Sequence, residues 1–261
     1  MLKNKKGQIT IFIIAGIVLV SVVALFFVFN KQIAINTTEK TEENPELFLE
    51  SCIEDKVKEA IEFISLRGGY VNNKLNINFK FEDEIAYNIS YLCYSQGSYL
   101  PCVNQKPTFM NDLRGEIKKY ILSDVEDCFN RIKSSFTKEG YEVGVEYNDF
   151  EVEIIPKRVI VQTDSKITLE KSGESTKQED FKVEVSSRLY EISFIIQELV
   201  NQEARFCYSE NLGIMLTSPE LIIDKFKTGE STIIYTVDHK ESKEKFRFAI
   251  RGCAIPPGLI L

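Results

Sequence analysis

Three short motifs place a serine or threonine hydroxyl near a lysine or an amide, as nucleophilic chemistry requires. They are Ser135-Phe136-Thr137-Lys138, Ser209-Glu210-Asn211 and Lys227-Thr228-Gly229, in that order along the chain. A serine hydroxyl becomes a nucleophile when a neighbouring base removes its proton, and a lysine can act as that base. The motifs therefore raise the question of a serine-dependent hydrolase.

These motifs resemble the signature triplets of penicillin-binding proteins and class A β-lactamases. The resemblance implies that Ser135 attacks, that Lys138 helps to take its proton, and that the other two triplets line the pocket. Ser135 falls at the end of a predicted helix, however, whereas the nucleophile of that family opens a buried helix. The interval between Asn211 and Lys227 is also far shorter than the domain of that family needs. A membrane-anchored hydrolase acting on the envelope is therefore the alternative, and a non-enzymatic protein is favoured.

Other catalytic and metal-binding patterns are missing from the sequence. His239 is the only histidine, and its charged surroundings predict an exposed turn rather than a general base. The chain has no C-x-x-C pair, no phosphate-binding glycine loop and no calcium loop. We therefore predict no catalytic residue, no metal site and no cofactor.

The chain contains an even number of cysteines, which predicts disulfides in an oxidising compartment. Cys93 and Cys102 enclose a turn-rich loop, so we expect them to pair. By elimination and order we favour Cys52–Cys128, which would link two predicted helices, and Cys207–Cys253; buried free thiols are the alternative. The six residues are Cys52, Cys93, Cys102, Cys128, Cys207 and Cys253.

The segment Ile9–Phe29 contains no charged residue. As a helix it would be about 31 Å long, which matches a bilayer core of about 30 Å. Lys3, Lys5 and Lys6 precede it, and such positive flanks stay in the cytoplasm. The sequence predicts a single-pass cell-membrane protein with a cytoplasmic N-terminus, an uncleaved apolar helix in the bilayer and an extracellular C-terminal part.

The predicted extracellular part is acidic. Beyond Asn30 there are 29 basic and 39 acidic residues, which gives a formal charge of −10. This charge argues against binding nucleic acid through phosphates, and against docking on anionic lipid headgroups. The expected partners are the bilayer, through Ile9–Phe29, and other proteins of a surface assembly.

The junction Lys5-Lys6-Gly7-Gln8-Ile9-Thr10 resembles that of archaeal class III signal peptides, as found in type IV pilin-like proteins. The resemblance implies cleavage between Gly7 and Gln8, with the apolar helix kept in the mature chain. Thr10 stands where that family usually has serine, and Phe12 where it has a glutamate. A simple uncleaved anchor is the alternative. The short basic head with a cysteine-bearing exterior also resembles many uncharacterised surface proteins of archaea.

Two Asn-x-Ser/Thr triplets fall on the predicted outer side. They begin at Asn36 and Asn88, and they predict sites for glycosylation.

The composition divides the chain into four parts. Residues 1–8 form a basic head, 9–29 the membrane helix, 30–45 a polar linker and 46–261 an extracellular domain, with a seam near Gly140 as an alternative. Apolar residues at helical spacing predict three helices in this domain, over 46–67, 113–139 and 189–200. Alternating apolar residues predict strands over 75–81, 85–91, 141–145, 150–155, 159–163, 167–169, 181–185, 233–237 and 246–250.

The order of these elements predicts an α+β domain in which helices pack on one face of an antiparallel sheet. Pro156-Lys157 and Ser172–Lys177 are the expected turns. Four tyrosines surround the Cys93–Cys102 loop. Ordinary packing is their expected role, and a contact surface is the alternative, because tyrosine provides contact area at a low entropic cost. These tyrosines are Tyr87, Tyr91, Tyr94 and Tyr99.

Overall fold

The computed structural model describes residues 16, 19–20, 44–97, 99–228 and 231–252. It divides the chain into two units, Met1–Asn44 and Pro45–Leu261. In the first unit four residues are described: residues 16, 19 and 20 are helical and Asn44 is not. The basic head, the Gly7–Gln8 junction, most of the predicted membrane segment, Asn36 and nearly all of the linker lie outside the described residues. Within the part that the structure describes, no helix has both the length and the apolar character needed to cross a membrane.

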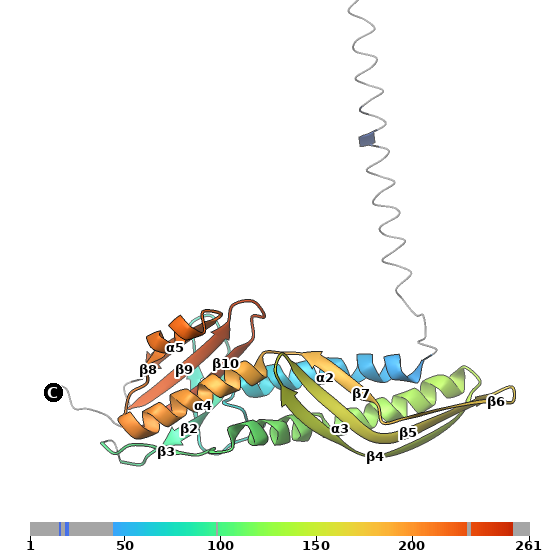
Figure 1. The fold of residues 1–261 in the computed structure, drawn as a ribbon, viewed down its shortest axis with the longest axis horizontal. Helices are drawn as coiled ribbons and strands as arrows, with labels where there is room; N and C mark the ends of the chain where they lie inside the picture. The colour runs from blue at the N-terminus through green and yellow to red at the C-terminus, as the bar shows by residue number, and fades with distance from the viewer. Residues whose placement is uncertain (1–15, 17–18, 21–43, 98, 229–230, 253–261) are drawn as a thin grey trace, which may run out of the picture. The chain divides into compact units, whose positions relative to one another are not determined.

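The second unit is an α+β domain, as predicted, with four helices and ten strands among its described residues (Figure 1). The helices are α2 (Pro45–Ser65), α3 (Phe109–Lys138), α4 (Leu189–Phe206) and α5 (Asn211–Thr217). The strands are β1 (Asn76–Lys80), β2 (Ala86–Tyr94), β3 (Val103–Asn104), β4 (Glu142–Ile155), β5 (Arg158–Lys171), β6 (Glu174–Glu179), β7 (Lys182–Ser186), β8 (Leu221–Lys227), β9 (Thr232–His239) and β10 (Lys245–Arg251).

The larger sheet has the order β1-β2-β10-β9-β8, with β3 paired to β2. Its pairs are antiparallel except for β2 and β10, which run parallel. The expectation of a purely antiparallel sheet is therefore wrong at this pair. A domain boundary at Gly140 would also separate β2 from β10, although they are neighbouring strands of one sheet.

The smaller sheet has β5 at its centre, with β4 on one side and β6 and β7 on the other. Each of the two predicted pairs of short strands between 141 and 169 is one long strand, β4 or β5. A register shift between Tyr147 and Asp149 accounts for the break in the alternation of β4. Lys157 adopts a φ of 70° in the expected turn between them.

The second predicted turn, Ser172–Lys177, is wrong in extent. Only Ser172 and Gly173 form the turn, with φ values of 54° and 88°, and two such residues make the tight connection that suits a hairpin. The next residues form β6, which pairs with β5. Because the side chains of β6 are polar and mostly exposed on both faces, its sequence lacks the apolar alternation that identifies a strand.

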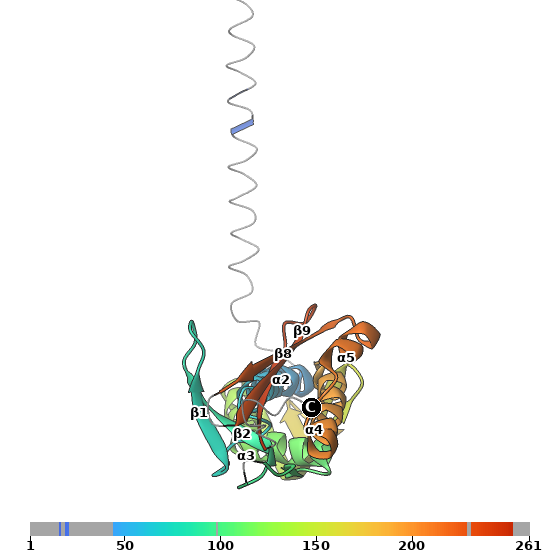
Figure 2. The same cartoon turned by 90° about the vertical axis from the view of Figure 1, so that its left-hand side faces the viewer.

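One apolar core joins the helices to both sheets. A single cluster of buried side chains includes residues of α2, α3 and α4 and of strands in each sheet. The predicted apolar stripes of α2 and α3 supply much of it, and Phe129 of α3 stacks on Tyr147 of β4 with ring centres 4.7 Å apart. On the other face of the larger sheet, Phe79 and Phe81 pack against Phe226 of β8. Figure 2 shows β1, an edge strand of this sheet, at one side of the domain and α4 and α5 at the other.

Two of the predicted disulfides are present in the structure. Cys52–Cys128 joins α2 to α3, and Cys93–Cys102 closes the loop after β2. Cys207 is also disulfide-bonded, but its predicted partner Cys253 lies outside the described residues.

Removing the two described disulfides should destabilise the domain to different extents. The bridged residues are 76 and 9 positions apart, and the longer loop restricts the unfolded chain more. From loop length alone, we expect Cys52→Ala/Cys128→Ala to lower the free energy of unfolding by about 4.5 kcal/mol, and Cys93→Ala/Cys102→Ala by about 2.5 kcal/mol. Urea unfolding of the two variants tests this, and equal losses or the reverse order would contradict it.

Candidate functional site

The structure does not bring the three serine and lysine motifs together. Ser135 lies in the last turn of α3, and Ser209 follows the end of α4. Figure 1 shows these two helices ending at opposite ends of the domain. Lys227 ends β8, and Gly229 lies outside the described residues.

Ser209 instead belongs to a buried polar cluster between α4, β8 and β9. Its Oγ lies 2.7 Å from Tyr235 OH and donates to Asn211 Oδ1 at 2.8 Å. Tyr235 OH also donates to the carboxylate of Glu203 on α4. Lys225 Nζ forms an ion pair with Glu203 Oε1 at 2.8 Å. We call Glu203, Ser209, Lys225 and Tyr235 the buried cluster.

The buried cluster holds α4 against the edge of the larger sheet rather than presenting a nucleophile. Glu203 is almost completely buried, and burial of a carboxylate is tolerated only when it is paired and hydrogen-bonded. Lys225 Nζ pairs with Glu203 and donates to Ser209 Oγ at 3.4 Å, so in this arrangement it is a hydrogen-bond donor to the serine. Burial, with the nearby Glu203 charge, raises the pKa of Tyr235 far above its usual range.

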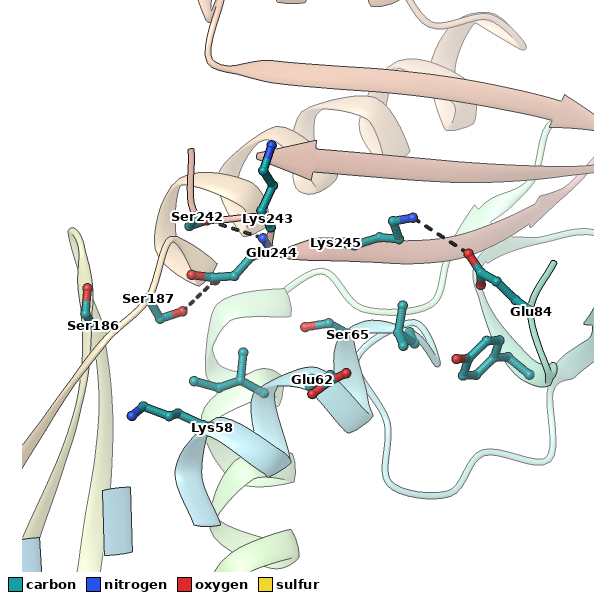
Figure 3. A pocket seen from close by; sticks show the side chains of 13 residues that line it. Lys58, Glu62, Ser65, Glu84, Ser186, Ser187, Ser242, Lys243, Glu244 and Lys245 are labelled. Atoms are coloured by element: carbon teal, nitrogen blue, oxygen red, sulfur yellow. Dashed lines mark hydrogen bonds and ion pairs between the residues drawn. The ribbon is translucent and has the colours of Figure 1, made fainter. Parts of the chain in front are cut away.

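A cleft with a volume of about 500 Å³ lies among the described residues (Figure 3). It lies between α2, the end of β7, the β1–β2 connection and the β9–β10 turn. Its polar side chains are mainly serines, lysines and glutamates, and Tyr87 is its only aromatic. These polar residues are Lys58, Glu62, Ser65, Glu84, Ser186, Ser187, Ser242, Lys243, Glu244 and Lys245.

Several of these charges are used within the fold. The Glu244 carboxylate accepts hydrogen bonds from Ser187 Oγ at 2.8 Å and from Arg188 N at 2.9 Å, so it caps the start of α4. Glu84 pairs with the buried Arg247, whose hydrogen bonds hold the pKa of the Glu84 carboxyl below its usual value. Lys245 Nζ lies 3.7 Å from Glu84. Figure 3 shows the Ser187–Glu244 and Lys245–Glu84 contacts across the cleft.

Ser242 in this cleft lies beside the single histidine. His239 is buried, so its expected exposure is wrong: β9 extends to His239, which pairs with Leu221 of β8. Ser242 Oγ lies 3.1 Å from His239 Nδ1, and Ser242 N donates to the same nitrogen at 3.1 Å. By accepting the hydrogen bond from Ser242 N, Nδ1 of His239 stabilises the β9–β10 turn. In a catalytic triad, a carboxylate hydrogen-bonds to one nitrogen of the histidine ring. Among the described residues, no carboxylate forms such a bond with Nε2 of His239, and Nδ1 is in contact with Ser242.

The tyrosine-rich surface predicted around Cys93–Cys102 is smaller and more apolar than expected. Tyr91 and Tyr94 pack on each other, with ring centres 5.2 Å apart. Tyr99 is 69% exposed, and it is accompanied by Leu100 at 61% and Val103 at 67%. Tyr99 and Leu100 lie in the loop that the bridge closes, and Val103 lies on β3 directly after it. We call these three exposed side chains the loop patch.

The structure places the remaining predicted sites as follows. Asn88 is exposed on β2, where its Oδ1 accepts a hydrogen bond from Asn78 at 2.7 Å. The described residues contain no cluster of three or more His, Cys, Asp or Glu side chains able to hold a metal ion.

No protein-family model, curated protein or solved structure matches this chain.

The Tyr235 hydroxyl should control part of the alkaline stability of the domain. Because the folded state raises the pKa of Tyr235 above its ordinary value of 10.0, the unfolded chain loses this proton first as the pH rises. Stability is therefore retained below about pH 10 and decreases above it. Tyr235→Phe should lower the free energy of unfolding at pH 7 by about 1–3 kcal/mol, because Glu203 and Ser209 lose a partner, and should make the alkaline decrease less steep.

Urea unfolding between pH 7 and pH 11 measures both effects. Tyr99→Phe is the matched control, since Tyr99 is exposed and should leave both the neutral stability and the alkaline slope as in the parent. An unchanged alkaline slope in Tyr235→Phe would show that this hydroxyl does not titrate differently in the folded and unfolded states.

Proposed function

We propose that this chain is a single-pass, membrane-anchored surface protein whose disulfide-bonded exterior domain acts by protein contacts, in a pilus-like or envelope assembly or in adhesion. The uncharged segment Ile9–Phe29 behind a basic head supports the anchor and its direction. The Cys52–Cys128 and Cys93–Cys102 disulfides support an oxidising compartment for the domain. Asn88 is exposed, as a glycosylated asparagine there would need to be.

The loop patch is the observation that carries the contact function. Tyr99 and Leu100 are exposed on the loop that the Cys93–Cys102 bridge closes, and Val103 is exposed on β3 directly after it. Contiguous exposed apolar residues are characteristic of protein-binding surfaces, and a fixed loop loses little entropy on binding. Phe206, 70% exposed, ends α4 at the same end of the domain as β3, whose Asn104 hydrogen-bonds Asn201 of α4 (Figure 1).

This contact surface lies at the far end of the domain from Pro45, where the domain follows the linker. Figure 1 shows α2 beginning at one end and α4 and β3 at the other. A surface protein tethered near Pro45 would thus present the loop patch at the end of the domain farthest from its own attachment point.

Protease treatment of intact cells tests the proposed location. We expect the domain beyond the linker to be digested, while a tag placed before Lys3 remains protected until the membrane is permeabilised. Protection of the domain in intact cells, together with digestion of the tag, would contradict the proposed direction.

Polar substitution of the loop patch tests the proposed mode of action. In Tyr99→Ser/Leu100→Ser/Val103→Ser, we expect cross-linked complexes recovered from the cell envelope to decrease by about tenfold or more, as the loss of several central contact residues produces. The melting temperature should stay within about 2 °C of the parent, because exposed side chains contribute little to stability.

Ile85→Ser/Leu122→Ser is the matched control, since both residues are exposed apolar side chains outside the loop patch. It should leave the complexes unchanged. Equal losses in the two variants would contradict a specific contact surface. Labelling of Ser135, Ser209 or Ser242 by a serine-reactive acylating probe would support the hydrolase alternative instead.

A further inference from the structure

The short helix α5 has an apolar face that none of the described residues covers. Leu212 and Leu216 are 70% and 83% exposed, and their four-residue spacing places them on the same side of the helix. Its other side packs on the domain through Ile214 and Met215. No residue of α5 is charged. The charge nearest along the chain is that of Glu210, whose carboxylate is taken up in capping the helix through Gly213 N. An exposed apolar face of this kind is a candidate surface for packing against another segment.

The chain itself supplies a segment of suitable composition. Residues Ala254–Leu261 read Ala-Ile-Pro-Pro-Gly-Leu-Ile-Leu and contain no charge. They follow Gly252, the last described residue, which lies against Cys102 and Leu100. The segment therefore begins at the same end of the domain as the end of α4 (Figure 1).

The third predicted disulfide would bring this segment next to α5. Cys207 is disulfide-bonded, and Cys253 is its predicted partner. Cys207 caps α4 in a left-handed conformation, and α5 begins at Asn211. Eight residues in extended form can reach about 26 Å, whereas a seven-residue helix is only about 10 Å long. The segment is thus long enough to cross the whole of α5.

We propose that the apolar segment Ala254–Leu261 packs in cis on the Leu212–Leu216 face of α5, held there by the Cys207–Cys253 bridge. Pro256 and Pro257 restrict the segment to extended conformations, so less conformational entropy is lost when it binds. The proposal rests on the third disulfide and not on the membrane anchor or on the loop patch. Its failure would therefore leave the proposed function untouched.

Site-specific photo-cross-linking of the full-length protein in detergent tests the proposal. A benzophenone amino acid replaces Leu216, whose high exposure makes the substitution tolerable, and a second protein carries it at Leu122 on α3 as the control. After irradiation and reduction, we expect peptide mass spectrometry to find adducts between position 216 and residues 254–261, and none of these from position 122.

Mixing isotopically light and heavy chains before irradiation identifies the occupant. Adducts within one chain support the proposal. Adducts that join light to heavy chains would show that a second copy covers α5, detergent or lipid adducts would show an amphiphile-binding face, and the lack of any adduct with residues 254–261 would show that the segment lies elsewhere. Each of these three results overturns the proposal.

A truncation gives an independent measurement. Ending the chain after Cys253 keeps both cysteines and should raise the fluorescence of a dye that binds exposed apolar surface by about twofold or more. The same truncation in a Leu212→Ser/Leu216→Ser background should cause no such increase, because the uncovered face is then polar. An equal increase in both backgrounds, or none in either, contradicts packing of this segment on α5.

Discussion

The parallel pairing of β2 with β10 is the constraint on which the arrangement of the domain depends. It joins a strand from the first half of the chain to the last described strand, and it makes the larger sheet continuous. Because parallel strands end at the same edge, the segments that follow Tyr94 and Arg251 leave the sheet together, and Ser95 N donates to Arg251 O at 2.8 Å. The disulfide loop and Gly252 are thereby neighbours, although they are far apart in sequence.

Polar interactions at the margins of the core hold the helices in register with this sheet. Glu203 ties the end of α4 to β8 and β9, and Glu244 caps its start from the β9–β10 turn. The buried Arg247 lies 4.2 Å from the centre of the Phe81 ring and pairs with Glu84. Isolated charges at these positions would be strongly destabilising, so each is matched by a partner from another element. The same pairing gives these residues a structural role between elements that are distant in sequence.

The sequence is a good guide wherever one face of an element is buried. The apolar spacing of α2 and α3 and the alternation in β1, β2, β9 and β10 predict these elements close to their observed bounds, whereas α4 begins as predicted and continues six residues further, to Phe206. It is a poor guide where that signal is weak. β6 has no apolar face, α5 is only seven residues long, and β3 is only two residues long. β8 carries a usable signal, since Leu221 and Ile223 are buried on alternate positions. Among the cysteines, the close spacing of Cys93 and Cys102 is enough to suggest their pairing, because a short loop brings its ends together at a low entropic cost.

Sequence analysis predicts the helices and strands that have one clear apolar face, the acidic charge of the domain and the candidate cysteine pairs, because these depend on composition and on the local periodicity of burial. Only the tertiary structure decided that β2 lies beside β10, that His239 and Ser209 are buried, and that Ser135 and Ser209 lie at opposite ends. Those outcomes depend on which distant surfaces pack best together, a sum over many weak contacts that no local pattern encodes. Tertiary packing likewise leaves Tyr99, Leu100 and Val103 exposed, whereas Tyr91 and Tyr94 pack on each other.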